Sequence, residues 1–310
     1  MKIKGLLLIL IFLVLLSGCE RKVEEKSKGK LFGVSYQTMN NPFFVDLDAG
    51  LREVIEANGD RMVTLDAQWN SLKQRNDISD LIMQEASAIF INPVNWKGIK
   101  GSLLQAQEKG IPCIVVDAPA QDKELVLCTV ASDNIKAGQM AAQELAEVCR
   151  PAKIVILHLQ LNKACIDRVT GFTEEIAKYP DMEIIDIQEG KGTTEGARPV
   201  MLDLLGRYPE INAAFPVNDP SALGAISALE STGRIEEVTV VAVDGSAEGI
   251  EAIKAGKLHS SSAQFPKEIG RTAALKAYEA LAGKEVEKEV KVKVELITKE
   301  NADEFLESNK

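Results

Sequence analysis

Residues that commonly bind metal ions or carry out nucleophilic catalysis are scarce in this 310-residue chain. It has two histidines, His158 and His259, and five cysteines with no CxxC pair. Structural zinc sites need cysteine and histidine ligands at short spacings, so we predict no metal site. The chain also lacks a GxSxG nucleophile motif and a GxxxxGK[ST] phosphate-binding loop. We therefore predict a protein that is not an enzyme and has no cofactor.

An excess of basic residues is also missing. The chain has 36 lysines and arginines against 46 aspartates and glutamates, which gives a formal net charge of −10. Proteins that bind nucleic acid need a basic surface to meet the phosphate backbone. This balance excludes nucleic acid as the expected partner.

Long apolar runs are absent except at the start of the chain. Residues 5–16 are almost wholly apolar, and Lys2 and Lys4 precede them. The run is too short to span a bilayer, and small residues follow it, as in a signal peptide. We predict that residues 1–18 are a signal peptide and that the rest of the chain is extracytoplasmic.

Cys19 follows Leu16-Ser17-Gly18, and this tetrapeptide resembles a bacterial lipoprotein site. The resemblance implies cleavage before Cys19 and attachment of acyl chains, palmitate among them, to its thiol and new amino terminus. Several acyl chains hold a protein on a membrane. The charged residues 19–29 then form a tether. The alternative is an ordinary secretory signal with an incidental cysteine.

Two further cysteines lie in apolar runs of strand length. Cys113 is in Ile111–Val116 and Cys128 follows Leu125-Val126-Leu127. The two could form a disulfide if their strands were neighbours in an oxidising compartment. We predict buried free thiols.

Short apolar runs alternate with amphipathic stretches along the whole chain. Helices are expected at 44–58, 135–148, 222–232 and 267–282, the first with an apolar face and an end at Asn58-Gly59. Such alternation indicates parallel sheets with crossover helices, and about eleven strands are too many for one sheet. We predict an α/β protein with two doubly wound parallel sheets. The expected strands are 31–36, 61–65, 88–91, 112–116, 126–130, 153–157, 182–187, 212–216, 238–243, 258–263 and 289–294.

Polar and aromatic side chains follow the expected strands. Open parallel sheets bind ligands at the carboxyl ends of their strands. Amides and carboxylates bind hydroxyls, and aromatic faces cover the apolar side of a sugar ring. The same residue types also cap helices, and we expect Asp219 and Ser246 to be such caps. The residues concerned are Gln37, Asn41, Phe43, Phe44, Asp66, Gln68, Trp69, Asn92, Trp96, Asp117, Asn218, Asp219, Asp244 and Gln264.

Taken together, these motifs resemble the ribose-binding branch of the periplasmic sugar-binding proteins, the receptors of ABC importers. The resemblance covers residues 30–298. Its motifs are Asn40-Asn41-Pro42-Phe43-Phe44, Ile91-Asn92-Pro93, Asp117, Ala131-Ser132-Asp133-Asn134, Asn218-Asp219, Val243-Asp244-Gly245 and Ala263-Gln264.

The resemblance implies two lobes that close on a small molecule and are joined by a three-stranded hinge. The chain would cross near Ser132-Asp133, near Gln264-Phe265 and near residue 293. The first lobe would hold residues 30–132 and 265–293, and the second 133–264 and 294–310. The implied ligand contacts are Asn41, Phe43, Phe44, Asp117, Asn218, Asp244 and Gln264.

Three positions depart from the ribose-binding pattern. Ala118 and Ile166 stand where ribose binders have arginines, and Gly192 stands where they have an aromatic. Buried carboxylates without cationic partners are costly, so Asp117 and Asp244 should favour a ligand rich in hydrogen-bond donors. We therefore expect a sugar, polyol or amino sugar other than D-ribose.

Five further residues are candidates for the pocket, although packing would also explain the two tryptophans. They are Gln37, Trp69, Trp96, Lys163 and Ile166.

Three functions fit these features. The first is a lipid-anchored, monomeric receptor that delivers its ligand to the permease of an ABC importer. The second is a receptor for a membrane sensor kinase or chemoreceptor, and neighbouring genes would separate the two. The third is a lipoprotein glycosidase that uses Asp117 and Asp244, which product analysis would detect. A transcriptional repressor is excluded because the signal peptide exports the chain and no helix-turn-helix precedes residue 31.

Overall fold

The computed structural model describes residues 29–308 of the chain. The predicted signal peptide, the lipidation site Cys19 and nearly all of the tether 19–29 lie outside the described residues. Between residues 29 and 308, every helix is too short or too polar to cross a lipid bilayer.

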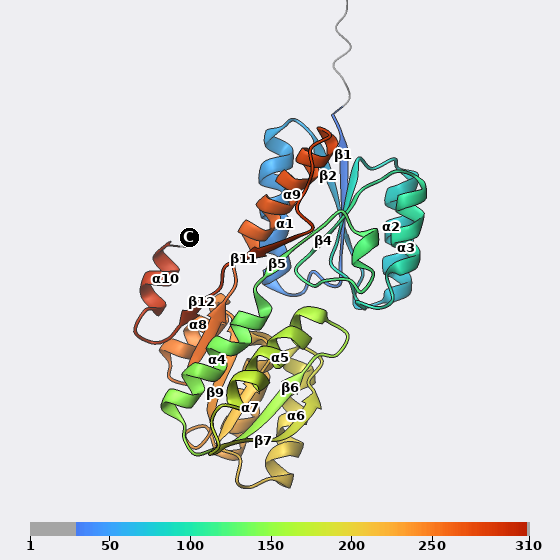
Figure 1. The fold of residues 1–310 in the computed structure, drawn as a ribbon. Coiled ribbons are helices and arrows are strands. Elements are labelled where there is room, and N and C mark those ends of the chain that lie inside the picture. The colour runs from blue at the N-terminus through green and yellow to red at the C-terminus, as the bar shows by residue number, and fades with distance from the viewer. Residues whose placement is uncertain (1–28, 309–310) are drawn as a thin grey trace, which may run out of the picture.

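The first lobe is built on a six-stranded parallel sheet with the strand order β11-β5-β4-β3-β1-β2. Helices α1 and α9 cover one face of this sheet, and α2 and α3 cover the other (Figure 1). The elements are β1 (Leu31–Tyr36), α1 (Pro42–Ala57), β2 (Arg61–Asp66), α2 (Ser71–Met83), β3 (Ala88–Ile91), α3 (Lys100–Glu108), β4 (Cys113–Val116), the 3-10 helix η1 (Lys123–Leu125), β5 (Cys128–Ser132), α9 (Pro266–Leu281) and β11 (Glu289–Val292).

The second lobe repeats this plan with the strand order β12-β10-β9-β8-β6-β7. Strand β12 runs antiparallel to β10, and the other neighbours are parallel. The elements are α4 (Asn134–Val148), β6 (Ala152–His158), α5 (Lys163–Ile176), β7 (Met182–Glu189), α6 (Thr194–Arg207), β8 (Ala213–Pro216), α7 (Asp219–Thr232), β9 (Thr239–Asp244), α8 (Ala247–Lys254), β10 (Ser260–Ala263), β12 (Glu295–Ile297) and α10 (Ala302–Ser308).

The predicted fold class is confirmed, because both lobes are α/β layers around parallel sheets. The chain passes from one sheet to the other between β5 and α4, between β10 and α9, and between β11 and β12. The strand expected over 289–294 is present but ends at Val292, and the short strand β12 that follows in the second sheet was not expected.

Helix α1 shows how the sequence pattern produces these layers. Leu47, Leu51 and Ile55 recur at helical spacing and are fully buried against the first sheet. The helix ends at Asn58, and the following Gly59 adopts a φ of +74°, a left-handed conformation that glycine accepts without strain. The expected end at Asn58-Gly59 is therefore confirmed.

The two strand cysteines lie on neighbouring strands but on opposite faces of the sheet. Cys128 of β5 is in register with Ile114 of β4, so it is offset by one residue from Cys113. Because successive side chains of a strand point to opposite faces, the two thiols pack into different cores. Both are free and buried, as predicted.

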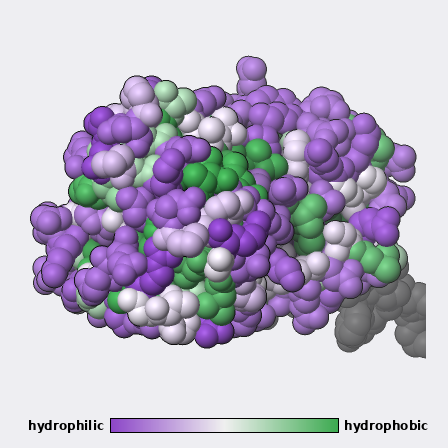
Figure 2. All heavy atoms as spheres, turned by 90° about the horizontal axis from the view of Figure 1, so that it is seen from below, coloured by the Kyte–Doolittle hydropathy of each residue, from purple (hydrophilic) through white to green (hydrophobic). Residues whose placement is uncertain are grey.

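The face of the molecule that is seen from below is mostly hydrophilic, and its apolar side chains form separate groups (Figure 2). Such a surface is typical of a protein surrounded by water.

Candidate functional site: a cleft between the lobes

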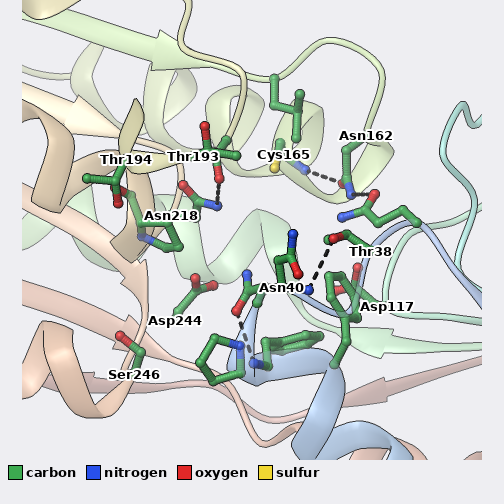
Figure 3. A pocket seen from close by; sticks show the side chains of 18 of the residues that line it. Thr38, Asn40, Asp117, Asn162, Cys165, Thr193, Thr194, Asn218, Asp244 and Ser246 are labelled. Carbon is green, nitrogen blue, oxygen red and sulfur yellow. Dashed lines mark hydrogen bonds between the residues drawn. The ribbon is translucent and has the colours of Figure 1, made fainter. Parts of the chain in front are cut away.

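A polar cleft of about 500 Å³ lies between the two lobes at the carboxyl ends of their strands. Figure 3 shows Thr38, Asn40 and Asp117 of the first lobe across from Asn162, Cys165, Thr193, Thr194 and Asn218 of the second. The cleft has the size range of small-molecule sites in proteins. A ligand within it would touch both lobes at once.

The structure brings together all seven residues that the resemblance implies as ligand contacts, and Gln37 and Trp69 lie with them. Trp96, Lys163 and Ile166 are not among the lining residues. On α5, the lining residues are Cys165 and Arg168, three positions apart, which share one face of the helix. Ile166 lies outside this face, so its expected place at the pocket is wrong.

Phe43 and Phe44 form an aromatic wall at the start of α1. Their rings meet edge to face, with centroids 5.2 Å apart. Phe44 is 3% exposed and also packs on Tyr36 in the core, whereas Phe43 is half-buried. Phe43 is therefore the more available of the two rings for a ligand.

Three asparagines at the cleft cap helices as well as lining it. Asn41 Oδ1 accepts from Phe43 N at 3.0 Å at the start of α1, and Asn162 Oδ1 accepts from Cys165 N at 3.1 Å at the start of α5. Asn218 caps α7 by accepting from Ser221 N at 3.1 Å, and its Nδ2 donates to the Gly192 carbonyl at 3.0 Å. Both ends of the Asn218 amide thus already have protein partners.

The caps correct one expectation and confirm another. Asn218, rather than Asp219, is the N-cap of α7, and the Asp219 carboxylate instead accepts from Ser246 N and Oγ, both at 2.8 Å. Ser246 caps α8 as expected, since its Oγ accepts from Gly249 N at 3.0 Å. Asp219 therefore fixes the start of α8 beside the cleft.

Arg168 also lines the cleft, although the sequence pattern did not single it out. Its side chain is 4% exposed, and its Nη1 lies 3.4 Å from Asp244 Oδ1. Nε donates to Asn134 Oδ1 at 2.8 Å, and Nη1 donates to the Val217 carbonyl at 2.9 Å. The expectation that Asp244 lacks a cationic partner is therefore wrong, and Arg168 is near enough to Asp117 to lower the pKa of that carboxyl as well.

Close packing of α4 and α5 holds Arg168 in place. A Cβ at Gly138 of α4 would lie 2.0 Å from the Arg168 carbonyl oxygen, and a Cβ at Gly171 of α5 would lie 2.1 Å from the Ile135 carbonyl oxygen. Only glycine permits this approach of the two helices. The approach brings the guanidinium to Asn134 at the start of α4.

Asp244 and Gln264 form a polar pair on adjacent strand ends. Gln264 Nε2 donates to Asp244 Oδ1 at 2.8 Å, and Asp219 N donates to Asp244 Oδ2 at 3.3 Å. Gln264 Oε1 is buried and has no hydrogen-bond partner within the described chain. Burial raises the pKa of Asp244, and it raises that of neighbouring Asp219 to about 7.

Asp117 carries a buried carboxyl on the first-lobe side of the cleft. Asn92 Nδ2 donates to its Oδ2 at 2.9 Å, and the residue is 4% exposed. Burial raises the pKa of Asp117 to about 7, against the lowering effect of Arg168. Part of the ligand-free population therefore carries a proton on Asp117 at neutral pH.

The raised pKa of Asp117 gives a prediction for stability. Between about pH 4 and 7 the folded protein keeps a proton that the unfolded chain has lost, so the free energy of unfolding falls as pH rises through this window. We expect Asp117→Asn to raise the melting temperature of the ligand-free protein at pH 8 by about 2–4 °C, because burying an uncharged amide costs less than burying an ionised carboxylate. The gain should shrink toward pH 4.

Calorimetric melting at pH 5 and pH 8 measures this difference. The matched control is Asp80→Asn, since Asp80 lies exposed on α2. A melting temperature at pH 8 equal to or below that of the unmodified protein would contradict the assignment.

Gly192 lines the cleft where the ribose-binding pattern has an aromatic. Its φ is +68°, and a Cβ there would lie 2.9 Å from Leu159 Cδ2. This backbone does not accommodate a larger side chain without rearrangement. The second-lobe wall is formed instead by Leu159, Thr193, Thr194 and Pro220.

The fold and the cleft define a two-lobed α/β protein with a small-molecule site between its lobes. The sequence matches the periplasmic binding protein domain family over residues 32–285. The chain belongs to this family, which confirms the resemblance found in the motifs.

Individual relatives agree with this assignment. The ribose import binding protein of Bacillus subtilis (strain 168) is 35% identical over 271 residues, covering 86% of each chain. A xylitol-binding protein of Mycolicibacterium smegmatis is 28% identical over 285 residues, covering 91% of this chain and 80% of the relative. A solved ABC transporter solute-binding protein from Bacillus halodurans, with bound myo-inositol, has a TM-score of 0.85 at 27% identity and covers 92% of this chain and 100% of that one.

Proposed function

We propose that this protein is an extracytoplasmic receptor that captures a neutral sugar or polyol between its lobes and delivers it to an ABC importer. The observation that carries the proposal is the cleft, which is lined by Phe43 from one lobe and by Arg168 and Asp244 from the other. An aromatic face covers the apolar side of a sugar, and carboxylate, amide and guanidinium groups bind its hydroxyls. The relatives named for ribose, xylitol and myo-inositol support this ligand class.

The charged residues that line the cleft restrict the class of ligand that it can bind. Four carboxylates line the cleft, from Asp117, Glu195, Asp244 and Glu248, and the lining has a single cation, Arg168. Anionic ligands such as sugar acids and sugar phosphates would meet like charge. We propose a neutral or amine-bearing ligand, and Ala118 and Gly192 continue to favour one other than D-ribose.

The proposed site binds its ligand without turnover. Native mass spectrometry of the freshly purified protein should show a carried-over ligand of sugar or polyol mass, and solution scattering should show a smaller radius of gyration with this ligand than without it. Incubation with sugars should leave them unchanged. Hydrolysis of a glycoside, or a radius that does not change at saturation, would contradict the proposal.

We also propose that lipid on Cys19 anchors the receptor to the cell membrane, with residues 20–29 as the tether. We expect Cys19→Ser to abolish acylation, because the thiol is the acceptor, so that the protein is released or stays unprocessed in the membrane fraction. Mass spectrometry of the amino-terminal peptide and cell fractionation test this. A variant that is acylated and processed normally would refute the anchor.

A further inference from the structure

The two lobes contact each other directly at the rim of the cleft, in part through residues that do not line it. Trp96, in the loop between β3 and α3, donates its backbone N–H to the Leu161 carbonyl in the turn between β6 and α5 at 3.2 Å. Beside this bond, Asn162 Nδ2 donates to Gln37 Oε1 at 3.3 Å. These bonds join the first lobe to the second directly.

A cation–π contact crosses the same rim. The Lys163 ammonium, at the start of α5, lies 6.0 Å from the centroid of the Trp96 ring. Lys97 lies 5.0 Å from the same centroid, but it belongs to the same lobe as Trp96. Of these two lysines, therefore, only Lys163 gains its contact when the lobes are together.

Trp96 and Lys163 are each held in place by contacts within their own lobe. The Trp96 carbonyl accepts from Gln121 N at 2.9 Å, which ties its loop to the segment after β4. On the other side, Asn162 caps α5, and Lys163 pairs with Asp167 one turn along. Because both segments are already constrained, forming the contact costs little conformational entropy.

We propose that Trp96, Leu161 and Lys163 form a latch that stabilises the closed arrangement of the lobes in the ligand-free protein. The latch sets affinity without touching the ligand, because a larger closed fraction raises the apparent affinity of a ligand that needs the closed state. Its effect on affinity rests on the proposed function, whereas its effect on lobe separation does not.

The test measures the distance between spin labels on the two lobes of the ligand-free protein. Labels at Gln107→Cys of α3 and Glu174→Cys of α5 occupy exposed positions, in a Cys149→Ser background that removes a half-buried thiol. We expect Lys163→Met and Trp96→Ala each to raise the ratio of open to closed protein about two- to fivefold. Trp96→Phe, which keeps a ring, should retain part of the closed population.

Lys97→Met is the matched control, because it removes a cation from the same ring within one lobe. It should leave the distance distribution unchanged. The latch is refuted if the unmodified protein has no closed population, if Lys163→Met does not shift the distribution, or if Lys97→Met shifts it equally.

Sugar binding is measured separately on the same variants. The apparent dissociation constant should rise in proportion to one plus the ratio of open to closed protein, because only the closed fraction is competent to bind. If no sugar or polyol binds, the proposed function fails, and the ligand-free distances still decide the latch.

Discussion

Replacing Arg168 by methionine is expected to lower the free energy of unfolding at pH 8 by about 3–5 kcal/mol. The substitution keeps most of the apolar stem but leaves Asp244, and beside it Asp117 and Asp219, buried without their cation. Removing one partner of a buried ion pair has a cost of this size. At pH 5 these carboxyls are protonated to a greater extent, so the deficit should be smaller there.

Urea unfolding at pH 5 and pH 8 checks this prediction, with Arg198→Met as the control because Arg198 is an exposed arginine of α6. A loss below about 1 kcal/mol at pH 8, or one that is the same at both pH values, would show that Arg168 does not compensate the buried carboxylates.

Asp117→Asn is expected to weaken sugar binding about 10- to 150-fold, although we expect it to stabilise the ligand-free protein. Hydrogen bonds to a charged acceptor contribute about 1.5–3 kcal/mol, and the amide replaces the charged acceptor with a neutral one. Asn92 already donates to one carboxylate oxygen, so the other is available to a ligand in the cleft.

Titration calorimetry with the identified ligand measures this loss, and Asp80→Asn serves again as the surface control. An affinity equal to that of the unmodified protein would place the ligand away from Asp117. Opposite changes in stability and affinity would show that the carboxylate is kept for binding at a cost to folding.

The strand and helix pattern of this chain was predictable because it depends on local periodicity. The burial of Leu47, Leu51 and Ile55 follows from their spacing alone. Ligands bind at the carboxyl ends of parallel strands, so residues that follow strands were expected to meet at one site. Asp117, Asp244 and Gln264 do line one cleft. Strand β12 was not predictable from local pattern, because this three-residue strand depends on pairing with β10 of the second sheet.

Arg168 was missed because a charged residue in an amphipathic helix usually faces solvent. Its burial depends on the close packing of α4 and α5 and on the strand ends beyond them, which no local pattern shows. A signal was present, however, since Cys165 and Arg168 lie three and six positions after the capping residue Asn162, on one face of α5.

Trp96 and Lys163 are the opposite case, because they were predicted at the pocket but do not line it. Both follow strand ends and were expected near the pocket, yet they meet each other at its rim. Position after a strand brings a residue to the correct edge of a lobe but does not fix the direction of its side chain. Of the two tryptophans, only Trp69 lines the cleft.

The most direct test of the account is titration calorimetry of the purified protein against neutral sugars and polyols, D-ribose included, with amino sugars, sugar acids and sugar phosphates in parallel. The account predicts saturable binding of one ligand per chain by a neutral or amine-bearing compound, tighter than for D-ribose, and no binding of the anionic ones. Absence of binding by every neutral and amine-bearing compound, or tighter binding of a sugar phosphate, would contradict it.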